Sequence, residues 1–69
     1  VAVRDIPGML SQLTQAIAEK RANIIDVNHD RTFDGLYLGE TAIEFVLETS
    51  GWEHTQSIEK SLAQFGRII

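Results

Sequence analysis

The sequence predicts an α+β fold in which two helices cover one face of a four-stranded antiparallel sheet. The chain has 69 residues, which suffices for one domain over residues 1–69 and no more. Two segments repeat apolar residues at helical spacing, and other segments are strand-like, two of them with apolar and polar residues in alternation. The order is strand, helix, strand, strand, helix, strand, and one-faced helices in that order must lie on one side of a sheet.

The first half of the chain supplies a strand, a helix and a second strand. Residues 1–5 form a short strand, and a helix follows from about Pro7 to Lys20, since proline suits a first helical turn. The apolar stripe of this helix consists of Leu10, Leu13 and Ile17, flanked by Met9 and Ala16. Residues 23–33 alternate as a strand does, and the face that we expect the helices to cover consists of Ile25, Val27, His29, Arg31 and Phe33.

The second half supplies a third strand, a second helix and a fourth strand. Asp34-Gly35 is a turn dipeptide, and residues 36–39 complete either a tight hairpin or a longer loop. Residues 40–49 alternate, and their predicted core face consists of Thr41, Ile43, Phe45, Leu47 and Thr49. A helix starts near Trp52, and Gly66 is expected to end it. Residues 67–69 begin the last strand, which completes a ferredoxin-like βαββαβ sandwich.

The composition excludes several classes of protein. Six basic residues against ten acidic ones give a net charge of −4 and leave no basic face for a nucleic acid. No apolar run approaches the roughly 20 residues that span a membrane, and we expect no leader of the signal-peptide kind. Without cysteine, neither a disulfide nor a thiolate metal site can support the small core, which makes association with a partner the expected remedy. Because the chain begins and ends within strands, we expect it to be a segment of a longer protein.

The segment from Asp5 to Leu10 joins the first strand to the first helix and is the main candidate for a binding site. The backbone N–H groups of a first helical turn have no partners inside the helix. Those of Gly8, Met9 and Leu10 are expected to point beyond the strand, where Gly8 lets a ligand approach closely. Such a turn suits a carboxylate. An ordinary capped turn explains the same residues, and the pattern alone leaves both interpretations open.

Two sets of residues resemble a known family. The first set looks like the opening half of an ACT domain, a small regulatory module that binds amino acids beside metabolic enzymes. The residues that carry this resemblance are Arg4-Asp5-Ile6-Pro7-Gly8, then Leu10, Leu13 and Ile17, then Ala22-Asn23-Ile24. The second half resembles the ACT domain at the C-terminus of threonine dehydratases, also called threonine ammonia-lyases. The residues that carry this second resemblance are His29-Asp30-Arg31, Leu38-Gly39-Glu40, Glu44-Phe45-Val46-Leu47-Glu48-Thr49 and Glu53-His54. The resemblance covers the whole chain and implies the same βαββαβ order.

The resemblance implies an amino-acid site at an interface between two ACT domains. The residues that carry over by motif are Asp5, Pro7, Gly8, Met9, Leu10, Asn23, Ile24 and Ile25. The implied ligand is a small effector (isoleucine, valine, threonine or serine), and the implied partner is a second ACT domain in a homodimer or larger homo-oligomer. The parent enzyme would be a cytoplasmic lyase with pyridoxal phosphate in its catalytic domain, whereas no cofactor is expected in this segment.

One residue departs from the family pattern. The family has glycine before the Ala-Asn-Ile run, at the end of the first helix, and this chain has Arg21 there. If that position is left-handed, a residue with a side chain costs about 1 kcal/mol. Either the helix ends differently or the fold tolerates the strain.

Other chemistries find weaker support. Asp26, His29 and Asp30, with His54, are metal-ligand types, but strand alternation puts His29 on the opposite face from both aspartates, so we expect no metal. No cysteine is present and no serine has a base at a recognisable spacing, so we expect no catalytic residue. Two alternatives remain open: a domain that only mediates oligomerisation, and an ACT domain of another amino-acid enzyme.

Overall fold

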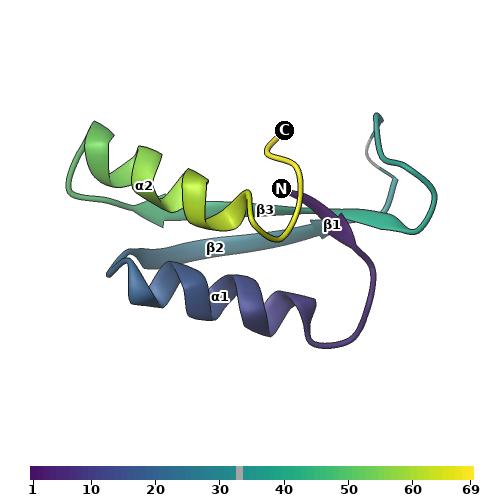
Figure 1. Ribbon diagram of the computed structural model, residues 1–69, viewed down its shortest axis with the longest axis horizontal. Helices are drawn as coiled ribbons and strands as arrows, with labels where there is room; N and C mark the ends of the chain where they lie inside the picture. The colour runs from purple at the N-terminus through teal and green to yellow at the C-terminus, as the bar shows by residue number, and fades with distance from the viewer. Residues whose placement is uncertain (33) are drawn as a thin grey trace.

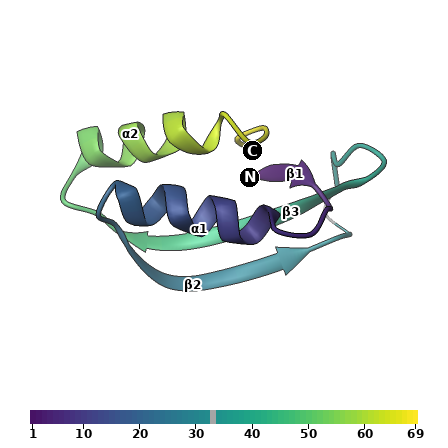
Figure 2. The same ribbon diagram turned by 60° about the horizontal axis from the view of Figure 1, so that its bottom comes forward.

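The computed structural model describes residues 1–32 and 34–69. Its elements are β1 (Ala2–Arg4), α1 (Met9–Glu19), β2 (Asn23–Asp30), β3 (Glu40–Glu48) and α2 (Trp52–Leu62). The three strands form an antiparallel sheet in the order β1-β3-β2. Both helices lie on the same face of this sheet (Figures 1 and 2), which confirms the predicted α+β layers. No helix in the described part of the chain is long and apolar enough to cross a membrane.

The predicted fourth strand over residues 67–69 is not formed in the described residues. Arg67 instead makes a single antiparallel bridge with Ala2, in which each backbone N–H donates to the other residue's carbonyl oxygen at 2.8 and 2.9 Å. The register of this bridge places Ile68 opposite Val1. The bridge lies on the far side of β1 from β3, which is consistent with the ferredoxin-like arrangement.

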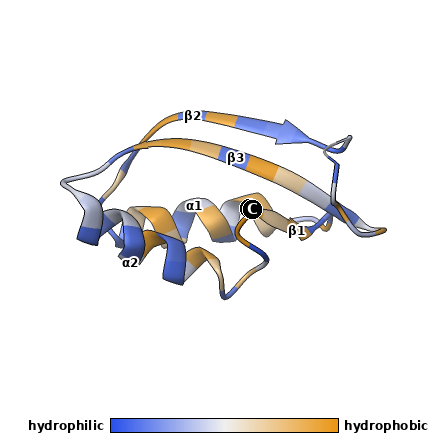
Figure 3. Cartoon of the chain, turned by 90° about the horizontal axis from the view of Figure 1, so that it is seen from above, coloured by the Kyte–Doolittle hydropathy of each residue, from blue (hydrophilic) through white to orange (hydrophobic). Residues whose placement is uncertain are grey.

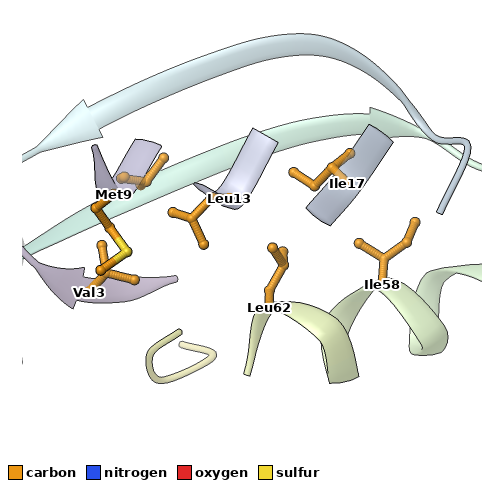
Figure 4. Close-up of a cluster of buried hydrophobic side chains, with 7 residues drawn as sticks. Val3, Met9, Leu13, Ile17, Ile58 and Leu62 are labelled. Atoms are coloured by element: carbon orange, nitrogen blue, oxygen red, sulfur yellow. The ribbon is translucent and has the colours of Figure 1, made fainter. Parts of the chain in front are cut away.

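The core lies between the two helices and the sheet. Seven buried side chains form it and are drawn in Figure 4, where all but Ile43 are labelled; the seven are Val3, Met9, Leu13, Ile17, Ile43, Ile58 and Leu62. Helix α1 begins at Met9 rather than at Pro7, and its buried stripe runs through Met9, Leu13 and Ile17 at steps of four. The prediction that Leu10 belongs to the buried stripe is wrong, because its side chain is 41% exposed.

Strand β3 has the predicted alternation from Ile43 to Glu48, whereas Ala42, on the face predicted to meet water, is buried. Ile43 is buried in the core, and Phe45 and Leu47 pack against it from the same face. Glu44 and Glu48, on the other face, are exposed. Burial on one face and solvation on the other is the pattern that alternation predicts for an antiparallel strand.

A bulge in β2 overturns part of the predicted face. Ile24 pairs with Leu47 and Asp26 with Val46, so that Ile25 has no partner on β3. The extra residue interrupts the period of two, and Ile25 is 62% exposed instead of packing under the helices. Beyond the bulge Val27 packs against the core as predicted, but His29, which was expected on the same covered face, is exposed. The strand ends at Asp30, and Phe33, which was expected to share this face, lies outside the described residues.

Arg21 adopts the left-handed conformation that the family pattern suggests for its position, with φ 61°. The N–H of Ala22 donates to the carbonyl of Ile17 at 3.4 Å, and that of Arg21 to the carbonyl of Ala18 at 2.9 Å. These two bonds define a Schellman C-cap, in which the left-handed residue is usually glycine. The fold therefore tolerates an arginine where glycine would be unstrained.

Gly66 does not end α2, as the sequence suggested, because that helix stops four residues earlier at Leu62. Its lack of a side chain is required by a close approach to β1. A Cβ at this position would lie 2.2 Å from the carbonyl oxygen of Ala2 and 2.6 Å from a methyl group of Val3. The contact holds the end of the chain against β1 beside the bridge.

Candidate functional site

The turn between β1 and α1 borders a cavity of about 320 Å³. Residues 4–10 supply most of the wall, His29 and Arg31 come from the end of β2 and just beyond it, and Thr41 and Ile43 come from β3. Figure 1 places the turn and the arrowhead of β2 at the same end of the molecule, and Figure 3 shows that this end of β2 is hydrophilic. The five predicted turn residues all line this cavity; they are Asp5, Pro7, Gly8, Met9 and Leu10.

The N-terminus of α1 presents free donors to this cavity. Gly8 is the N-cap residue, its φ of 84° is left-handed, and no side chain caps the helix. Of the three N–H groups that the sequence suggested, that of Met9 donates to the carbonyl of Ile6 at 3.3 Å. Within the described residues, those of Gly8 and Leu10 have no acceptor. Two unpaired N–H groups at the positive end of a helix dipole favour an anion.

Asp5 ties the turn to both ends of the β2–β3 loop. Arg31 donates two hydrogen bonds to its carboxylate, from Nε to Oδ2 at 2.8 Å and from Nη2 to Oδ1 at 3.3 Å. The backbone N–H of Asp5 donates to the carbonyl of Gly39 at 2.8 Å. The hydrogen bond from Arg31 holds the pKa of the Asp5 carboxyl below its ordinary value. Asp5 is therefore a carboxylate that orients the turn and faces the cavity at the same time.

Arg67 anchors the same loop from the C-terminal side. Its guanidinium donates to Glu40 Oε1 at 2.5 Å and to the carbonyl of Gly35 at 3.1 Å, and it stacks 4.1 Å from the centre of the Tyr37 ring. Hydrogen bonds from Arg67 and then from the Tyr37 backbone N–H lower the pKa of Glu40. Arg67 also forms the bridge with Ala2, so its contacts hold this end of the loop near β1. Gly39, whose carbonyl accepts from the backbone N–H of Asp5, lies at the same end.

Asn23, Ile24 and Ile25 lie at the start of β2, at the other end of α1 from the turn. The eleven residues of α1 span about 16 Å at the usual rise per residue. The Asn23 side chain donates to Glu48 Oε1 on β3 at 3.2 Å, and all three residues are exposed. Within one copy of the chain, the predicted site therefore divides into two groups that do not share a cavity.

Sequence reasoning missed the part that Arg31 and His29 take in this cavity. Strand alternation assigned both residues to the covered face, and apart from the family motif only His29 was considered for a site, as a metal ligand. The contact between Arg31 and Asp5 joins residues 26 positions apart, and no local period reports such a pairing. A matching pair of opposite charges at two strand ends was the one available signal.

Three of the four residues considered for a metal make other hydrogen bonds. Asp26 accepts from the backbone N–H of Val27 at 2.9 Å, and Asp30 accepts from Thr32. His54 Nδ1 accepts from the Ser50 N–H at 3.0 Å, so that its Nε2 donates to the carbonyl of Lys20 at 2.5 Å. Among residues 1–32 and 34–69, no three such side chains are grouped to hold a metal ion.

Comparison with known proteins agrees with this architecture. The family profile described as the ACT domain matches residues 1–66. The chain belongs to the ACT domain family. This ACT domain is 39% identical over its 69 residues to a protein of Geobacter sulfurreducens named L-threonine ammonia-lyase. It is 38% identical over 64 residues, 93% of the chain, to the L-threonine ammonia-lyase of Thermotoga maritima. The chain spans only 17% and 16% of the lengths of these relatives. No solved structure matches it.

Proposed function

We propose that this ACT domain is the amino-acid-binding regulatory module of a cytoplasmic threonine ammonia-lyase. Two relatives that bear this name match the domain over nearly all of its length. In such an enzyme, pyridoxal phosphate would belong to the catalytic domain, and the ACT domain would act through the ligand that it binds. A ligand can shift the enzyme between two states only by its difference in affinity for them.

The cavity at the β1–α1 turn is the observation that carries the proposal. Its volume of about 320 Å³ is at the small end for ligand sites, which suits a single small amino acid. The carboxylate of the amino acid would accept from the N–H groups of Gly8 and Leu10 at the start of α1. The half-exposed side chains of Ile6 and Leu10 offer apolar surface for a branched side chain such as that of isoleucine or valine.

A second copy of the domain would bring the two halves of the predicted site together. Strand β2 is at the edge of the sheet in the described residues, with β3 on one side and no strand on the other (Figure 2). Two copies that pair antiparallel through this edge place the start of one β2 beside the end of the other. Asn23, Ile24 and Ile25 of one copy would then approach the turn cavity of its partner, where the Asn23 amide can both donate and accept.

Calorimetric titration of the 69-residue chain with isoleucine, valine, threonine and serine tests this proposal. We expect at least one of them to release heat at millimolar concentration or below and the domain to sediment as a dimer. Asn23→Ala should weaken that binding about tenfold, the loss of roughly one charge-assisted hydrogen bond. Asn28→Ala is the matched control, because Asn28 lies on the same strand and makes the same 3.2 Å bond to a glutamate on β3.

The free edge of β2 also supports the alternative that the domain serves only to oligomerise its enzyme. The same experiments separate the two proposals. A stable dimer that releases no heat with any of the four amino acids supports the oligomerisation role and refutes the regulatory one. A monomer at high concentration that binds nothing refutes both.

A further inference from the structure

The turn cavity carries an excess of positive charge in a chain whose net charge is −4. The charged residues that line it are Arg4, Arg31 and Asp5, two of the six basic residues of the sequence against one carboxylate. The positive end of the α1 dipole adds to this excess. The charges around the cavity therefore favour an anionic group.

Arg31 has donors to spare for such a group. Its guanidinium carries five N–H donors, and the two bonds to Asp5 occupy one on Nε and one on Nη2. The side chain is 62% exposed, so a ligand can reach the remaining donors. The bidentate contact with Asp5 fixes the plane of the guanidinium before any ligand arrives, which reduces the entropy that binding must remove.

We propose that Arg31 binds the carboxylate of the effector directly, together with the free N–H groups at the start of α1, while Asp5 faces its ammonium group. The Asp5–Arg31 pair then complements a zwitterion, and both charges of a free amino acid are required for full affinity. This inference rests on the proposed function for the identity of the ligand. It adds a specificity-determining residue, because amines and neutral amides of the same shape lack the group that Arg31 binds.

Arg31 could instead act only by positioning the turn through Asp5, and variants separate these roles. Arg31→Gln should weaken binding of isoleucine about tenfold, both in the native background and in an Asp5→Asn background. If Arg31 only positions Asp5, Arg31→Gln should not change the affinity for isoleucine in the Asp5→Asn background. Lys60→Gln is the control, since it removes one exposed positive charge from α2, away from both groups of the proposed site.

Nuclear magnetic resonance titration of the 69-residue chain tests the contact itself. The probes are isoleucine, its analogue without the amino group and its analogue without the carboxylate. We expect the first two to shift the Nε–H signal of Arg31 and the amide signals of Gly8 and Leu10, and the third to leave them in place. Equal shifts from all three probes, or carboxylate binding that leaves the Arg31 signal unmoved, would overturn the inference.

The outcomes also separate this inference from the proposed function. Isoleucine binding with no response of Arg31, and with equal affinity in Arg31→Gln, refutes the inference and leaves the regulatory function standing. If the analogue without the amino group shifts the Arg31 signal but no amino acid binds, the anion site is supported and the regulatory function is refuted. The spectrum of each variant should be that of a folded domain, which shows that a loss of binding is not caused by unfolding.

Discussion

Replacing Arg21 by glycine should stabilise the domain. Arg21 has a φ of 61° at the residue after the C-cap of α1, and its backbone N–H bonds are those of a Schellman motif. A side chain in the left-handed region costs about 1–2 kcal/mol, and the extra freedom of glycine in the unfolded chain offsets about 0.5–1 kcal/mol of the gain. The expected net gain in the free energy of unfolding is therefore about 0.5–1 kcal/mol.

Thermal unfolding followed by circular dichroism measures this gain. For a domain of this size, 1 kcal/mol shifts Tm by about 4–8 °C, so Arg21→Gly should raise Tm by about 2–8 °C. Arg21→Ala removes the charge but keeps Cβ, and Lys20→Gly introduces glycine at a residue whose φ is −87°, so neither should gain stability. An equal rise in Arg21→Ala, or a fall in Arg21→Gly, would refute the argument from backbone strain.

Three further predictions concern packing and charge. Gly66→Ala should lower the free energy of unfolding in urea by about 1–3 kcal/mol, because its Cβ meets the carbonyl of Ala2 at 2.2 Å; an unchanged midpoint would contradict the contact. Leu13→Ala, at a fully buried position, should cost about 2–5 kcal/mol and Leu10→Ala much less, and equal losses would contradict the assigned core. The pKa of Asp5 is lowered in the fold, so its contribution to stability is present above the pKa of an unfolded aspartate, about 3.9, and is lost as the pH falls below it. Asp5→Asn should accordingly show a smaller fall in Tm between pH 5 and pH 2, and an unaltered fall would refute the role of the ion pair.

The candidate site was predictable only in part. The turn from Asp5 to Leu10 combines local signals, a proline and a glycine before an amphipathic helix, and all of its predicted residues line one cavity. The placement of Asn23 relative to that cavity was not predictable, because it depends on the length and direction of α1 between them. Arg31 was missed for the same reason, since its carboxylate partner is distant in sequence and near only after folding.

The bulge at Ile25 shows where strand patterns fail. Alternation assigns every second residue to one face, and a single inserted residue reverses that assignment for one side of the bulge. Ile25 is apolar and β-branched, so its composition predicts burial, yet it has no partner on β3 and is exposed. Whether Ile25 is buried or exposed therefore depends on how β2 pairs with β3 rather than on the sequence of β2.

Sequence patterns alone predicted the α+β class, the two helices, most of the alternation of β3 and the ACT family, because each depends on a period or a motif that is contiguous along the chain. Which ends of these elements meet became visible only in the folded chain. It joined Asp5 to Arg31, reduced the fourth strand to the bridge between Ala2 and Arg67, and placed Asn23 at the far end of α1 from the turn. These features depend on register and on contacts between distant residues, whose energies appear only when the chain is packed.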